Sequence, residues 1–168
     1  MRKARDWFEA YAVSHQHGVN QAIHFFAVPA ILFSIVGLLW QIRLPIAGYE
    51  NELWCNAGAA SAAAALFFYL SMRSISIFML MIGVLGGACG LAYWVSTLGY
   101  GTTEQVVLWS AVFVVSWIFQ SIGHGVFEKA KPSFFEDILF LLVGPAWVFA
   151  KLLRLPSAKV AKGSQQKK

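Results

Sequence analysis

The sequence predicts an all-α protein, an integral membrane helical bundle with four transmembrane spans, and two observations predict it. Hydrophobic residues make up 58% of the 168 residues and charged residues only 12%, which leaves too few polar side chains to cover a water-soluble domain. Stretches without charged residues also recur along the chain, and four of them are long enough for the roughly 20 apolar residues that a span needs. These four stretches are residues 10–42, 53–72, 74–103 and 105–127.

The N-terminal segment precedes the first span. Residues 2–14 alternate basic, acidic and aromatic side chains, and Trp7, Phe8 and Tyr11 share one face of a helix. Such an amphipathic pattern is typical of a helix that lies in the membrane interface. A cleaved signal peptide is not expected, because the basic start leads into the polar run SHQHGVNQ instead of an apolar stretch.

The expected spans are bounded by charged residues and by residues that interrupt helices. The first ends before Pro45, since proline cannot continue a helix. Alanines in the second span and glycines in the third permit close packing between helices. We expect the four spans at Phe25–Ile42, Leu53–Met72, Ile75–Thr97 and Gln105–Gly123.

A fifth apolar stretch, residues 138–150, is too short to cross the membrane in the same way. Gly144 and Pro145 divide it, which predicts a broken helix that either re-enters the membrane or lies in its interface. We therefore expect residues 1–155 to form a single membrane domain. Residues 156–168 are polar and basic and are expected to form a disordered tail.

Basic residues indicate the orientation. If both termini are cytoplasmic, twelve of the 13 Lys and Arg residues lie inside and only Arg43 lies outside, as the positive-inside rule requires. The net charge of +5 then reflects contact with membrane lipids, and we expect no nucleic acid partner. A bacterial inner membrane is favoured, with the endoplasmic reticulum membrane as the equivalent site in a eukaryote. Oligomeric state is not indicated by the sequence.

Four histidines are brought to one depth by this topology. His15, His17 and His24 lie at the start of the first span, and His124 lies at the end of the fourth. Polar side chains at membrane depth are costly, and those present tend to line cavities, pair with each other or bind ligands. Imidazole is a ligand for iron, zinc, copper and nickel. The alternative is a set of interfacial histidines that only form hydrogen bonds.

Local spacing refines the expected group at the first span. His17, Asn20 and His24 follow one helical face, whereas His15 would point the opposite way in a continuous helix. A helix that begins near Gly18 would let His15 fold back toward His24, with Asn20 placed to orient the site.

The fourth span carries a second polar row. Gln120, His124 and Glu128 recur every four residues and share a face. We expect Glu128 to orient His124 through a hydrogen bond, as carboxylates do behind metal-binding histidines. Direct ligation of a metal by Glu128, and an ion pair between Glu128 and Lys131, are the alternatives.

Two motifs carry a resemblance to a known family. The segment YAVSHQHGVNQAIHFFAVP fits Y-x-x-x-H-x-x-x-x-N-x-x-x-H followed by proline, and QSIGHGVFEKAKP fits Q-x-x-G-H-x-x-F-E-x-x-x-P. The chain resembles, over residues 7–153, a family of small multispan membrane proteins whose characterised fungal member is an iron(II)-dependent 2-hydroxy fatty acid dioxygenase. Gly18 departs from the family, which commonly has proline there.

The resemblance implies Fe(II) as cofactor and a 2-hydroxy fatty acid and O₂ as substrates. The implied reaction is α-oxidation, which yields a fatty acid one carbon shorter, CO₂ and water. Two other functions remain open from the residues alone: a non-enzymatic lipid-binding or transport protein, and a zinc-dependent lipid hydrolase. The resemblance assigns metal-binding and catalytic roles to His15, His24 and His124, and supporting roles to Asn20, Gln120 and Glu128. His17 falls at a variable position of the family, and we expect it among the supporting residues.

Overall fold

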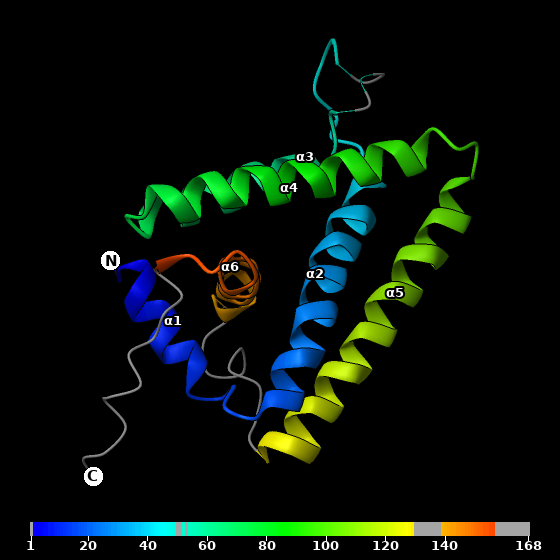
Figure 1. The fold of residues 1–168 in the computed structure, drawn as a ribbon. Coiled ribbons are helices and arrows are strands. Elements are labelled where there is room, and N and C mark those ends of the chain that lie inside the picture. The colour runs from blue at the N-terminus through cyan, green and yellow to red at the C-terminus, as the bar shows by residue number, and fades with distance from the viewer. Residues whose placement is uncertain (1, 50–51, 53, 130–138, 157–168) are drawn as a thin grey trace.

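The computed structural model describes residues 2–49, 52, 54–129 and 139–156. All the secondary-structure elements within these residues are helices (Figure 1). The expected all-α class is confirmed. In chain order the elements are α1 (Ala4–Ala12), α2 (Gly18–Trp40), α3 (Ala57–Ser71), α4 (Ile75–Ser96), α5 (Thr102–Ile122), the π-helix η1 (Gly123–Glu128) and α6 (Phe140–Leu152).

Three of these helices are long and apolar enough to cross a membrane. They are α2, α4 and the continuous helix Thr102–Glu128, which joins α5 to η1. Helix α3 forms within the second expected span but has only 15 residues, which is a length of about 22 Å against a hydrocarbon core of about 30 Å. Helices thus form in all four expected segments, and the count of four complete spans stays a prediction.

The long helices form two pairs instead of one bundle of parallel axes. Helices α2 and α5 run antiparallel along one another, and the antiparallel pair α3 and α4 lies across them at a steep angle (Figure 1). Helices α1 and α6 pack in the angle between the two pairs. This arrangement brings the first turns of α2 beside the last turns of α5 and η1, far from the loop that joins α2 to α3.

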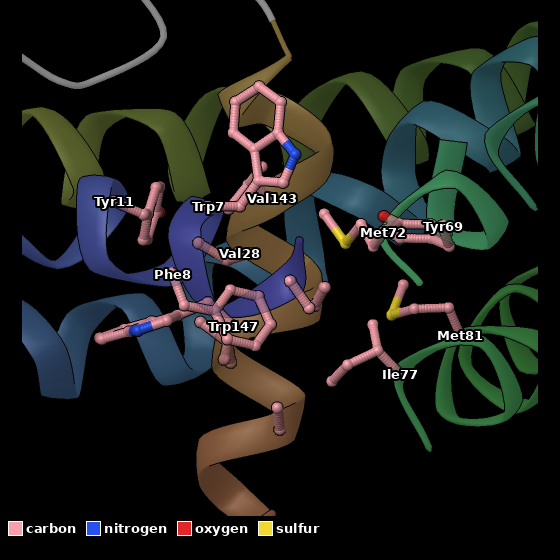
Figure 2. Close-up of a cluster of buried hydrophobic side chains, with 14 of the residues drawn as sticks. Trp7, Phe8, Tyr11, Val28, Tyr69, Met72, Ile77, Met81, Val143 and Trp147 are labelled. Carbon is pink, nitrogen blue, oxygen red and sulfur yellow. The ribbon is translucent and has the colours of Figure 1, made fainter. Parts of the chain in front are cut away.

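Helix α1 packs against protein. Its buried face contains Trp7, Phe8 and Tyr11, which lie against α6 and the turn between α3 and α4 (Figure 2). The backbone N–H of Ala4 also donates to the carbonyl of Met72 at 3.0 Å. The expected N-terminal amphipathic helix is present, but neighbouring helices cover its apolar face. The structure therefore does not support the expectation that this face lies in the membrane interface.

Helix α6 continues through Gly144 and Pro145, so the expected break in this segment was wrong. A proline inside a helix removes one hydrogen bond and crowds the preceding turn, and packing on several sides offsets that cost here. Val143, Ala146 and Val148 have no exposed surface, because α1, α2 and α4 all contact α6. The expected disordered tail lies outside the described residues except for Pro156.

Candidate metal centre

Three histidines from two ends of the sequence converge in the structure. His15 precedes α2, His24 lies in the second turn of α2, and His124 lies in the first turn of η1, and all three are at least 98% buried. The Nε2 atom of His24 is 3.0 Å from Nε2 of His15 and 3.2 Å from Nε2 of His124. Helix α2 begins at Gly18 and His15 folds back toward His24, as the spacing predicts.

Hydrogen bonds on the far side of two rings determine where their protons are. Nδ1 of His15 lies 2.7 Å from the carbonyl oxygen of Tyr11, and Nδ1 of His24 lies 2.9 Å from that of Asn20. A carbonyl oxygen only accepts, so each Nδ1 carries the proton and each Nε2 presents a bare lone pair. Two lone pairs therefore face one another, an arrangement that repels unless a cation lies near both.

Protonation does not resolve this repulsion at His15. Burial, and next the charge of a protonated His24, lower the pKa of His15 to about 2, so its imidazole is neutral in the folded protein. Neutral imidazole is the form that binds metals.

The geometry fits a shared metal ion. One ligand nitrogen from each histidine lies within 4.8 Å of the other two. If two nitrogens each lie about 2.1 Å from one ion and the angle at the ion is about 90°, the nitrogens are about 3.0 Å apart. This value is close to the distances from Nε2 of His24 to Nε2 of His15 and of His124. His15, His24 and His124 therefore could hold one metal ion through their Nε2 atoms.

Glu128 occupies a different position from the one expected. Its Oε1 accepts hydrogen bonds from Nδ2 of Asn20 at 3.1 Å and from the backbone N–H of His17 at 2.7 Å. Nδ1 of His124 is buried and has no partner among the described residues, so the expected hydrogen bond from His124 to Glu128 is not formed. Glu128 instead ties η1 to the start of α2, and the alternative partner Lys131 lies outside the described residues.

His17 lies outside the group of three. It is exposed, caps α2 by accepting the N–H of Val19 at Nδ1, and stacks on Phe127 with ring centroids 5.3 Å apart. These contacts give His17 a local role at the start of α2.

A cavity of about 50 Å³ opens beside the three histidines. Its walls change in character along the helices: on α2 the lining passes from His24 to Val28 and Ile31, and on α5 it passes from His124 through Gln120 to Trp117. The cavity is thus polar at the histidines and apolar toward the middle of the spans. Its remaining lining residues are Tyr11, His15, Leu32, Phe140, Leu141, Gly144 and Pro145.

Further side chains, which were not predicted as site residues from the sequence, hold the His15 segment. The ring of Tyr11 stacks on His15 with centroids 4.0 Å apart. Nζ of Lys151 donates to Oε1 of Gln21 at 2.6 Å, and Nε2 of Gln21 donates to the carbonyl of His15 at 2.7 Å. Tyr11 had a sequence signal, because it lies four residues before His15, whereas no local pattern links Lys151 to Gln21.

The fold and the site together define a helical membrane protein with a buried group of three histidines suited to one metal ion. The chain belongs to the Mpo1-like family, described as 2-hydroxy-palmitic acid dioxygenase Mpo1-like, which it matches over residues 1–155. It is 26% identical over 144 residues to the 2-hydroxy-palmitic acid dioxygenase MPO1 of Saccharomyces cerevisiae, an alignment that covers 85% of this chain and 75% of the yeast protein. No solved structure matches the chain.

Proposed function

We propose that the chain is an Fe(II)-dependent dioxygenase that shortens 2-hydroxy fatty acids by one carbon. The observation that carries the proposal is the pair of bare Nε2 lone pairs that face each other 3.0 Å apart on His15 and His24, with His124 beside them. The reaction balances without an external reductant: 2-hydroxypalmitate and O₂ give pentadecanoate, CO₂ and water, counted as the free acids.

Family membership favours iron over zinc for this site. Three histidines serve as zinc ligands in some hydrolytic sites, so the ligand set alone does not identify the metal. A bound Fe(II) ion supplies the one-electron chemistry that O₂ requires, and the yeast relative is named as a dioxygenase. Under the proposal, His15, His24 and His124 hold the iron.

The cavity supports a substrate with one polar end and one apolar end. We place the carboxylate and 2-hydroxyl group beside the histidines and Gln120, with the acyl chain directed toward Ile31 and Trp117. The acyl chain gains little by leaving lipid for an equally apolar wall, so the cavity acts mainly by placing the head group.

Two neighbours of the histidines have supporting roles in the proposal. The carbonyl of Asn20 fixes the ring of His24 at 2.9 Å, and Glu128 fixes the side chain of Asn20 at 3.1 Å. Such contacts behind a ligand orient it and stabilise its tautomer.

The orientation of the chain is part of the proposal. The distribution of Lys and Arg supports cytoplasmic termini, and with this orientation the histidine end of α2 and η1 is on the cytoplasmic side. The proposed membrane is a bacterial inner membrane. A membrane-impermeant thiol reagent tests this with single cysteines at Val13 and Gly48 in a chain whose native cysteines are replaced. We expect only the Gly48 variant to be labelled in intact cells. Labelling of only the Val13 variant would show that the orientation is opposite to the proposed one.

Metal analysis tests the site. The protein is purified without oxygen, and bound metal is quantified for the wild type and for His24→Ala, His124→Ala and the control His17→Ala. We expect about one iron per chain in the wild type and in His17→Ala and a large loss in the other two. Unchanged iron content in His24→Ala and His124→Ala would refute the site. Bound zinc instead of iron, together with no reaction of the zinc-loaded protein with O₂, would favour a hydrolase.

A further inference from the structure

Tyr11 is held rigidly at the edge of the candidate metal centre. Its side chain is 5% exposed and its ring lies nearly parallel to that of His15, at 17° and 4.0 Å between centroids. On its other sides Tyr11 contacts Trp147 and Phe140 of α6, with centroids 5.4 Å and 6.0 Å away. These contacts fix the direction in which the phenol hydroxyl points (Figure 2 labels Tyr11 and Trp147).

The Tyr11 hydroxyl lies at the cavity, close to Gly144 of α6. Tyr11 and Gly144 both line the cavity, and a Cβ added to Gly144 would lie 2.9 Å from the hydroxyl oxygen, so the absence of a side chain at Gly144 makes room for it. Within the part of the chain that the structure describes, this hydroxyl makes no hydrogen bond. By contrast, the hydroxyl of Tyr69 donates to the carbonyl of Leu142 at 2.8 Å.

Although Tyr11 as a whole is buried, its hydroxyl oxygen keeps accessible surface, unlike buried atoms without a partner such as Nδ1 of His124. The hydroxyl of Tyr11 is therefore an available donor in a cavity that the three histidines also line. A tyrosine hydroxyl offers one donor and two acceptor sites, and a carboxylate is its strongest natural acceptor.

We infer that the hydroxyl of Tyr11 donates a hydrogen bond to the head group of the bound 2-hydroxy acid, and that Gly144 is small so that this hydroxyl can reach it. The inference rests on the proposed function and extends it by naming a residue that contacts the substrate directly. Tyr11 thereby selects acids with an oxygen-rich head group, while its ring positions His15.

The substitution Tyr11→Phe removes the hydroxyl and keeps the stacked ring. In full-length, iron-loaded protein under anaerobic conditions, we expect the dissociation constant for 2-hydroxypalmitate to rise about 10- to 100-fold, as the loss of a hydrogen bond to a charged group predicts, with iron content unchanged. The control Tyr69→Phe should leave that dissociation constant unchanged. Palmitate serves as a second probe: a parallel loss of palmitate binding indicates contact with the carboxylate, and a loss confined to 2-hydroxypalmitate indicates contact with the 2-hydroxyl group.

A double-mutant cycle separates the hydroxyl from the fold. Gly144→Ala crowds the hydroxyl oxygen at 2.9 Å, whereas the nearest ring atoms lie at 3.4 Å or more. We expect Gly144→Ala to weaken binding of 2-hydroxypalmitate in the wild-type background and to have little further effect in Tyr11→Phe. Equal losses in both backgrounds would overturn the inference, as would unchanged binding in Tyr11→Phe.

Failure of the inference is distinguishable from failure of the proposed function. If the wild type converts 2-hydroxypalmitate and Tyr11→Phe binds it equally well, only the Tyr11 contact is wrong. If the wild type binds the acid and does not convert it, the proposed reaction is wrong, and the binding measurements still decide the role of Tyr11.

Discussion

The two glycines that flank His124 provide a matched test of how the site is held together. A Cβ added at Gly123 would overlap Oδ1 of Asn20, whereas a Cβ added at Gly125 meets nothing within 4 Å. Asn20 is fully buried, so it cannot move aside freely. Gly123→Ala must therefore displace Asn20 or separate η1 from α2.

The expected magnitudes follow from these contacts. Overpacking of a buried site costs about 1–3 kcal/mol of unfolding free energy, and disturbance of the group behind a metal ligand lowers metal affinity about 10- to 100-fold. Both losses are expected in Gly123→Ala, because Asn20 orients His24 and contacts Glu128. Gly125→Ala should bind iron normally and be as stable as the wild type or slightly more stable.

A third variant separates stability from metal binding. A Cβ at Gly37 would overlap the ring of Trp109, about 20 Å along α2 from His24 at 1.5 Å per residue. Gly37→Ala should lose a similar 1–3 kcal/mol and keep its iron affinity. The assays are denaturant unfolding in detergent and anaerobic Fe(II) titration, and Gly123→Ala with the iron affinity of Gly125→Ala would refute the reasoning.

Two further predictions concern the segment that carries His15. Lys151→Met removes the hydrogen bond to Gln21 at 2.6 Å. Because Lys151 is only partly buried, we expect the free energy of iron binding to weaken by about 1 kcal/mol, which lowers the iron affinity about fivefold. The exposed Arg154→Met is the control, and equal affinities for the two variants would exclude this role for Lys151. The second prediction is that acid destabilises the metal-free protein. The pKa of His15 is about 2 in the folded state and about 6.5 in the unfolded chain. Below pH 6.5 only the unfolded chain takes up this proton, so the free energy of unfolding falls by up to about 1.4 kcal/mol per pH unit. His15→Gln should show a smaller slope between pH 6.5 and pH 5 in denaturant unfolding, and an identical slope would contradict a buried, neutral His15.

Helix positions and the convergence of three histidines were predictable from the sequence. Charged residues are so costly in lipid that gaps between them mark the long helices. The same topology brought His124 level with His24, and Gly18 indicated the fold-back of His15. These predictions depend on strong energetic terms that act locally or along the membrane normal.

The packing of the short helices could not be predicted in the same way. Lipid and protein interiors are equally apolar, so the apolar face of α1 carried no information on which of them covers it. Similarly, Pro145 indicated a break in the helix. That prediction was wrong because neighbouring helices bury α6 on several sides, which the sequence does not show. The partner of Glu128 was missed because the choice between His124 and Asn20 depends on the π-helical turn of η1.

The most direct test of the central claim is the fate of the carboxyl carbon of 2-hydroxypalmitate. The acid, labelled with ¹³C at that carbon, is incubated with iron-loaded protein and O₂, and CO₂ and fatty acids are analysed by mass spectrometry. We predict labelled CO₂ and unlabelled pentadecanoate in equal amounts from the wild type and from His17→Ala, and neither product from His24→Ala. Labelled acid that remains intact with the iron-loaded wild type, or equal product from His24→Ala, would contradict the proposed dioxygenase.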